Sequence, residues 1–240
     1  MLRRLRRLLR LGRIDEALDL ARQESDSSSK CLSAARALWN AGQGDEAIAI
    51  ARHGLALPGP KDRLMAWLTE RYLESGEARS ALEMELARFE EHPSLSRYRA
   101  VAVIARQLEQ WEALRHDVIL SLKERHDVAS LVEIYLMEGE IDAAIDMVLV
   151  EHTPEEHTVK VARAAARERP YRAIEIYKRL VERLIERGDR QHYRRAAEYA
   201  RHLRDLYRAL GMEREWERYK AALLTRNARR PALAEELGAL

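Results

Sequence analysis

Cysteine is nearly absent from this sequence, because Cys31 is the only one among 240 residues. A single thiol excludes an intramolecular disulfide framework and a cysteine-based zinc cage, and it fits a reducing, cytoplasmic setting. Histidines do not replace it as ligands. The closest pairs, His152 with His157 and His116 with His126, have spacings that do not place both rings on one helical face. The sequence therefore predicts no metal site and no cofactor.

Long apolar runs and reactive motifs are missing too. No uncharged run approaches the ~18 residues of a membrane span, and no apolar signal-peptide core follows the start. There is no glycine-rich phosphate loop, nucleophile elbow or HExxH pair. The acids Glu138, Glu140 and Asp142 lie near a turn, where the helix dipole favours them for structural reasons. We expect neither an enzyme nor a membrane-bound protein.

Strand-forming and chain-breaking residues are scarce, with one Phe, 6 Pro and 10 Gly. Ala, Leu, Arg and Glu dominate instead, a composition typical of long surface-exposed helices. No Ser/Gly/Pro-rich linker divides the chain. We therefore expect one helical-repeat domain over residues 1–240, with regular repeats in 1–153 and longer, basic capping helices in 154–240.

A short signature recurs through the first 150 residues. Its copies are LGRIDEAL at 11–18, AGQGDEAI at 41–48, SGEARSAL at 75–82, LEQWEAL at 108–114 and EGEIDAAI at 138–145. Each copy carries a small residue on its apolar face, at Ala17, Ala47, Ala81, Ala113 and Ala144. The spacings of 30, 34, 32 and 31 fit two helices of about four turns with two short turns. This period is that of tetratricopeptide-type (TPR) arrays.

The chemistry of the signature explains its spacing. Glycine stands where one helix must end, at Gly12, Gly42, Gly76 and Gly139, because it adopts the left-handed conformation without cost. The next helix buries residues at i, i+3, i+4 and i+7, and no single pair can bury such a face alone. We predict an all-α fold, a right-handed α-α superhelix (TPR-like solenoid) of about seven helix pairs. Such surfaces usually bind a protein or peptide partner, whose identity the sequence leaves open together with the oligomeric state.

The other helices are predicted from the same apolar period and from residues that typically start or end a helix. They cover Lys30–Ala41, Asp62–Ser75, Leu95–Leu108, His126–Glu138, Pro154–Glu168, Tyr171–Arg187, Arg190–Leu210 and Glu213–Asn227. Pro231 starts a short terminal helix or breaks the last one.

The first thirteen residues, MLRRLRRLLRLGR, contain no acid and resemble a transit peptide or a membrane-surface helix. The interpretation we favour is a helix with Leu2, Leu5, Leu8 and Leu9 facing the core and the arginines facing water. The segment leads directly into the first repeat, which supports this interpretation.

Positive charge is concentrated toward the C-terminus. Residues 160–240 carry 21 Lys+Arg and 12 Asp+Glu, whereas residues 1–159 carry 21 Lys+Arg and 28 Asp+Glu. The net charges of the two segments are therefore +9 and −7. Within the helix expected over Arg190–Leu210, an outward stripe is formed by Arg194, Arg201, Arg204 and Arg208. The stripe can hold phosphates, which makes a nucleic acid the alternative partner. Otherwise its arginines pair with Glu198 and Asp205 on the helix surface.

The closing stretch, residues 193–237, resembles the end of bacterial SWIM zinc-finger proteins. The similarity lies in Tyr193–Tyr199, Leu203–Tyr207, Gly211, Trp216, Arg229–Arg230 and Leu237. It implies terminal helical repeats and an association with nucleic acids or proteins through an upstream CxCx(n)CxH zinc motif. Cys31 alone cannot supply that motif. The resemblance thus implies a stand-alone relative or the C-terminal region of a longer protein, and the start inside a short helix favours the latter.

Overall fold

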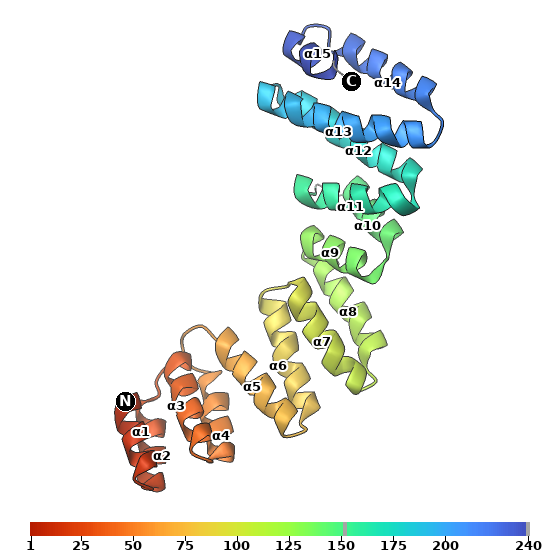
Figure 1. Cartoon of the computed structure of the whole chain (residues 1–240). Coiled ribbons are helices and arrows are strands. Elements are labelled where there is room, and N and C mark those ends of the chain that lie inside the picture. Colours follow the sequence, from red (N-terminus) through yellow and green to blue (C-terminus); the bar gives the residue numbers. More distant parts are fainter. Residues whose placement is uncertain (151–152, 239–240) are drawn as a thin grey trace. The chain divides into compact units, whose positions relative to one another are not determined.

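The computed structural model describes residues 1–150 and 153–238, and every regular element in these ranges is an α-helix (Figure 1). The chain forms two compact units, Met1–Val118 and Ile119–Leu240, whose boundary falls within helix α8, Trp111–Glu124. The predicted all-helical class is confirmed, and within each unit the helices stack as in a TPR-like solenoid. The single domain over residues 1–240 stays a prediction.

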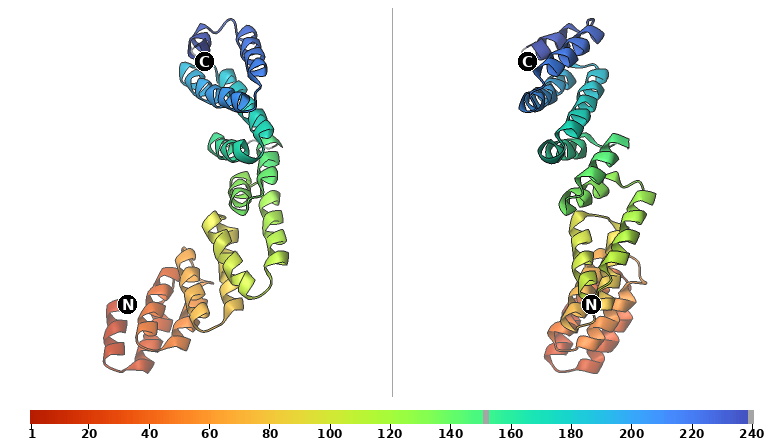
Figure 2. Two further views of the ribbon diagram at one scale, coloured as in Figure 1. Left: turned by 45° about the vertical axis from the view of Figure 1, so that its right-hand side comes forward. Right: turned by 90° about the vertical axis from the view of Figure 1, so that its right-hand side faces the viewer.

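In the first unit, successive helices are joined by short turns and lie side by side (Figure 2). They are α1 Leu2–Arg10, α2 Ile14–Glu24, α3 Ser28–Asn40, α4 Gly44–Gly54, α5 Asp62–Glu74, α6 Ala78–Glu91 and α7 Leu95–Gln107. Helix α3 packs on α4 and α5 packs on α6. The odd-numbered helices, here called first helices, also contact the next pair, since α1 packs on α3 and α3 on α5.

The second unit also consists of packed helices, and the longest of them, α12 and α13, have 18 and 20 residues. They are α9 Val128–Glu138, α10 Ile141–Val150, α11 Glu155–Glu168, α12 Pro170–Arg187, α13 Arg190–Ala209, α14 Glu213–Arg226 and α15 Pro231–Gly238. Helix α12 packs on α11 and on α13, and the short α15 returns onto α13. The helix bounds expected from the sequence agree with these within two residues, and Pro231 does start a helix.

Small residues bring the second helix of each pair close to its neighbours. Ala17, Ala47, Ala81 and Ala144 are fully buried, as the signature predicts. Ala113, in contrast, is exposed. The turn before α8 has its left-handed residue at Glu109, so the position five residues later is Leu114. The assignment of Ala113 to the buried face is wrong by one residue, because LEQWEAL lacks the glycine that marks the turn.

Two turns reach the left-handed conformation without glycine. Glu109 and His126, which follow α7 and α8, have φ of 56° and 53°, whereas Gly76 and Gly139, which follow α5 and α9, have φ of 79° and 77°. For a residue with a Cβ this conformation costs roughly 1–2 kcal/mol. Both turns that flank α8 therefore carry a local cost that the glycine turns avoid.

The arginine-rich start of the chain is part of the first repeat. Leu5 is fully buried, Leu2, Leu8 and Leu9 are half-buried, and the arginines of α1 are exposed. The favoured interpretation of residues 1–13 is confirmed. Over the described ranges, no helix combines the length and apolar character needed to cross a bilayer.

The buried face of α10 can be tested by overpacking. Ala144→Trp places an indole where α10 packs against its neighbours, and we expect it to lower the free energy of unfolding by about 1–3 kcal/mol. The urea midpoint measures this loss. Ala113→Trp, on the exposed side of α8, is the control and should change stability by less than about 0.5 kcal/mol. An unchanged midpoint for Ala144→Trp would mean that this face is misplaced.

The turn strain predicts a stabilising substitution. Glu109→Gly removes the cost of the left-handed conformation but increases the conformational entropy of the unfolded chain. We therefore expect the free energy of unfolding to rise by up to about 1 kcal/mol, measured as a higher thermal midpoint. Gly76→Ala, at the equivalent position of another turn, should shift the midpoint the opposite way. A lower midpoint for Glu109→Gly would contradict the strain at this turn.

Candidate functional site

Helix α13 holds the arginine stripe expected to contact anions. The helix begins at Arg190 because the Asp189 carboxylate accepts a hydrogen bond from the backbone N–H of His192 at 2.9 Å. This bond from the backbone amide lowers the pKa of Asp189 and keeps the cap charged. The apolar face of α13 is buried, which leaves the stripe on the solvent side. Arg194, Arg201 and Arg208 are exposed and Arg204 is half-buried.

The four arginines have different surroundings. Arg194 Nε lies 3.3 Å from Glu236 Oε1 of α15, and Arg204 Nη2 lies 3.2 Å from Asp205 Oδ1. The expected pairing with Glu198 is wrong, because α15 folds back onto α13 and supplies Glu236 instead. In the described part of the chain, no carboxylate lies within 4.0 Å of the Arg201 or Arg208 guanidinium. Only these two members of the stripe are open to an external anion.

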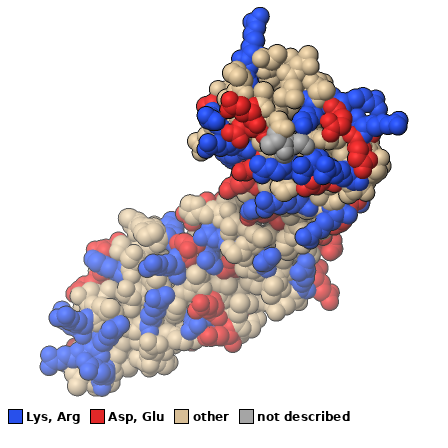
Figure 3. All heavy atoms as spheres, turned by 45° about the horizontal axis from the view of Figure 1, so that its top comes forward, with Lys and Arg blue, Asp and Glu red and all other residues tan. Residues whose placement is uncertain are grey.

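Part of the remaining positive charge in the second unit pairs with acids of helices one repeat earlier in the sequence. Basic and acidic partners stand 26 or 27 residues apart, at N–O distances of 2.7–2.8 Å. The pairs are Lys160–Glu133, Arg169–Asp142 and Arg172–Asp146. Blue and red spheres accordingly lie interspersed over this unit (Figure 3). Part of the basic charge of residues 160–240 thus neutralises acids of the preceding helices.

A half-buried polar cluster ties α11 to α13. The Glu155 carboxylate accepts hydrogen bonds from the Arg195 guanidinium and, at 2.7 Å, from the Tyr199 hydroxyl. Burial, together with the neighbouring carboxylate, raises the pKa of Tyr199 to about 12. Tyr199 therefore remains a neutral hydrogen-bond donor at neutral pH. The cluster fixes helix packing and offers no proton for chemistry.

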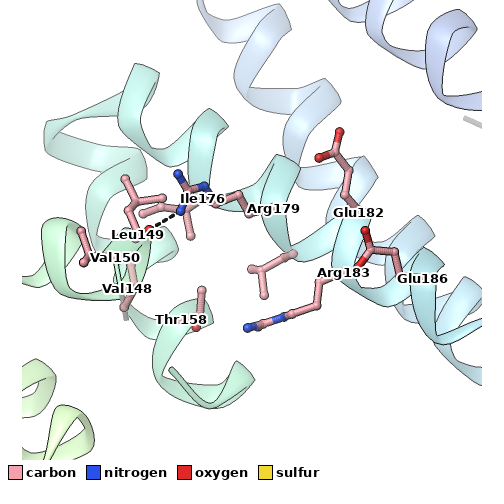
Figure 4. Close-up of a pocket in the computed structure, with 10 residues that line it drawn as sticks. Val148, Leu149, Val150, Thr158, Ile176, Arg179, Glu182, Arg183 and Glu186 are labelled. Carbon is pink, nitrogen blue, oxygen red and sulfur yellow. Dashed lines mark hydrogen bonds between the residues drawn. The ribbon is translucent and has the colours of Figure 1, made fainter. Parts of the chain in front are cut away.

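A pocket of about 420 Å³ opens in the second unit where α12 faces the end of α10 (Figure 4). Its lining comprises Val148, Leu149, Val150, Thr158, Ile176, Arg179, Leu180, Glu182, Arg183 and Glu186. Two arginines of α12 project into it and donate hydrogen bonds to main-chain carbonyls, Arg179 to Leu149 and Arg183 to Thr153. These bonds supply donors to carbonyls that lie at or just beyond the end of α10. The pocket is explained by helix capping.

A larger cleft, of about 640 Å³, lies in the first unit between α1 and α3. It is lined by Arg6, Leu9, Arg10, Ala37, Asn40 and Ala41. All but Ala41, which caps α3, lie within first helices. This cleft was not predicted from the sequence.

Exposed apolar side chains continue the cleft onto later first helices. Counting back from the left-handed residue of each turn, Leu73 of α5 is equivalent to Leu9, and Val103 of α7 is equivalent to Arg6. Leu73 is 43% exposed and Val103 is 55% exposed. Trp39 of α3, half-buried, occupies the same position as Leu9 and Leu73. We call the cleft residues with Trp39, Leu73 and Val103 the first-helix face.

Packing between first helices makes this face rigid. The guanidinium carbon of Arg71 lies 4.9 Å from the ring centroid of Trp39 and 5.7 Å from that of Trp67. The two indoles meet edge to face at 5.9 Å. Such cation–π and aromatic contacts contribute about 0.5–2 kcal/mol each. They hold Trp39 of α3 against α5 and fix the middle of the first-helix face.

His157 and Asp142 make contacts within the fold, whereas His116 and His126 are exposed. His152 lies outside the described residues. His157 is buried with its Nε2 3.2 Å from Glu156, and Asp142 accepts two hydrogen bonds from Arg169 at 3.0 and 2.8 Å. Within residues 1–150 and 153–238, no group of three or more His, Cys, Asp or Glu side chains is placed to hold a metal ion.

A scan against protein-family models and a search of curated proteins find no match. Among solved structures, the C-terminal part of a TPR repeat-containing protein from Cytophaga hutchinsonii is 14% identical with a TM-score of 0.37, and the match covers 99% of both chains. The human IFIT1 dimer with m7Gppp-AAAA is 15% identical with a TM-score of 0.30, and the match covers 88% of this chain and 58% of IFIT1. Similarities of this size carry no argument about function.

The α13 stripe can be tested for a structural role. Replacing Arg194, Arg201, Arg204 and Arg208 together by Gln removes two exposed ion pairs, each contributing roughly 0–1 kcal/mol. We expect the variant to keep its helical circular dichroism and to lose at most about 2 kcal/mol of stability in urea. A larger loss would show that the stripe has buried contacts.

Proposed function

We propose that this chain is a non-enzymatic scaffold that binds a protein partner across the first-helix face of its first unit. The observation that carries the proposal is the exposure of Leu73 and Val103 at repeat positions equivalent to cleft residues of α1. Stacked repeats bring equivalent positions of successive first helices onto one surface. Apolar side chains that gather on such a surface mark an interaction site.

The composition of the face fits a protein interface. Interfaces combine an apolar centre with a polar rim and are enriched in aromatic residues and arginine. Leu9, Trp39 and Leu73 supply an apolar row along three successive first helices, and Arg10 and Asn40 border it. A pre-formed surface loses little side-chain entropy when it binds. At the centre of the row, the stacking of Trp39 on Arg71 holds the indole in place before a partner binds.

The same proposal includes a cytoplasmic location and a relationship to SWIM zinc-finger proteins. Cys31 is free and fully buried, and burial raises the pKa of its thiol, which suits a protein of the reducing cytoplasm. Kinship with SWIM zinc-finger proteins is supported by residues 193–237 alone. In that stretch Tyr193, Tyr207 and Trp216 form the buried faces of α13 and α14, so the resemblance reflects helix packing.

The alternative function is nucleic-acid binding through the C-terminal helices. Arg201 and Arg208 favour it, since both are exposed and have no carboxylate within 4.0 Å among the described residues. With only two open arginines, the α13 variant described above should flatten the salt dependence of binding by up to about two units, one for each phosphate that is no longer bound. Wild-type affinity of that variant for DNA and RNA at low salt would eliminate the stripe as a binding site.

The scaffold function predicts a separation of binding from folding. Leu73→Asp with Val103→Asp places charge in the proposed interface, and because interface anchors cost more than about 1 kcal/mol each, we expect at least a tenfold loss of affinity for the partner. Quantitative mass spectrometry after affinity capture identifies proteins that wild type retains and the variant loses. Their affinities are then measured with purified components.

Leu120→Asp is the matched control, because Leu120 is a 46% exposed leucine on α8, which is not a first helix. It should retain the partner. Equal recovery by wild type and by the first-helix variant would remove this face as the site. Turnover of a defined small molecule, with no protein retained, would overturn the scaffold function itself.

A further inference from the structure

Helix α1 is a strongly cationic element. It contains five arginines and no acid among its nine residues. At about 100° per residue, Arg3, Arg6, Arg7 and Arg10 fall within a sector of about 100° on the side away from the buried Leu5. All four are exposed. We call these four residues the arginine face.

The arginine face lacks the acidic partners that neutralise the second unit. Arg4, outside the face, lies 3.9 Å from Glu24, and Arg13 pairs with Glu16. Among the described residues, no carboxylate lies within 4.0 Å of the four guanidinium groups of the face. Arg10 Nε donates a hydrogen bond to the Arg6 carbonyl at 3.4 Å, and this bond does not use the other donors of the Arg10 guanidinium. Blue spheres crowd this end of the first unit (Figure 3).

The helix dipole adds to the unfavourable electrostatics. Arg3 lies in the first turn of α1, where the positive end of the dipole disfavours a cation. Like charges three and four residues apart on a helix also repel each other. A bound polyanion relieves both effects. Because the four arginines have no carboxylate partners among the described residues, binding also breaks no ion pair of the face.

We propose that the arginine face of α1 binds the phosphate backbone of a nucleic acid. Guanidinium groups match phosphate oxygens with two parallel hydrogen bonds. The leucines of α1 are buried or half-buried, so the face presents charge with little apolar surface. Protein interfaces are depleted of charge at their centre, whereas phosphate binding requires only the charges.

This site lies at the opposite end of the sequence from the basic C-terminal segment. Arg194 and Arg204 already have carboxylate partners, and binding through them would break those pairs. The observation that carries the protein-scaffold proposal is the exposure of Leu73 and Val103, and neither residue belongs to the arginine face. The double variant at those two residues should therefore bind nucleic acid as wild type does.

The experiment compares two variants that remove the same charge. Fluorescence anisotropy measures binding of a labelled 20-nucleotide single-stranded RNA from 50 to 200 mM KCl. Arg3, Arg6, Arg7 and Arg10 changed together to Gln should flatten the salt slope by up to about three units on single strands, about 0.7 for each phosphate bound. We expect at least a tenfold loss of affinity at 50 mM salt. The matched control, with Gln at the four α13 arginines, should change affinity less than threefold.

Two further variants distinguish a loss of nucleic-acid binding from a loss of folding. Arg3→Gln with Arg7→Gln leaves the cleft residues Arg6 and Arg10 in place and should remove about half of the slope change. The quadruple Arg→Lys variant keeps the charges and should keep the slope. Thermal unfolding of each variant confirms that binding and folding are measured separately.

Three results would overturn the proposal. The first is wild-type affinity and salt slope for the folded quadruple Gln variant. The second is an equal loss in the α13 control, which would indicate a general charge effect. The third is competition by polyglutamate as effective as competition by RNA of equal charge, which would assign the face to an acidic protein.

Discussion

The whole structure depends on one constraint, that no helix pair can bury its apolar face without the next pair. The four alanines at the close crossings are fully buried, so the distance between neighbouring helices allows no larger side chain there. This requirement fixes the period of the sequence at about thirty residues and leaves only outward positions free to vary. A residue that departs from its equivalents at an outward position is therefore informative. Val103, which stands where α1 carries Arg6, is such a departure.

The same period controls how charge is distributed. Arg169 and Asp142 stand 27 residues apart, and Arg172 and Asp146 stand 26 apart, so one repeat brings each base onto an acid of the preceding helices. Each exposed pair contributes little to stability, roughly 0–1 kcal/mol. Their larger effect is on surface potential, because pairs of this kind offset part of the positive excess that the sequence shows in residues 160–240. Net charge counted along the chain of a repeat protein therefore locates a cationic surface poorly.

The sequence predicted features that depend on local signals. Helix bounds agree within two residues because apolar periodicity and turn glycines are local properties. Ala113 was misplaced because Glu109 adopts the left-handed conformation without being glycine. The partner of Arg194 was also wrong, since Glu236 reaches it only through the return of α15 onto α13. The cleft between α1 and α3 was missed because it requires the relative placement of side chains from two repeats.

The two proposed surfaces share side chains, and this links their ligands. Arg6 and Arg10 line the cleft of the first-helix face and also belong to the arginine face of α1. A phosphate backbone held by them neutralises the charge that borders the apolar row, and a protein seated in the cleft covers the same guanidinium groups. Thermodynamic linkage requires that the effect be reciprocal, so nucleic acid weakens the protein partner by the factor by which that partner weakens nucleic acid. Leu73 and Val103, which lie on α5 and α7, take no part in this competition. Nucleic acid would not weaken a partner held mainly by those two residues. The factor by which nucleic acid weakens protein binding therefore measures how much of the protein interface lies over α1.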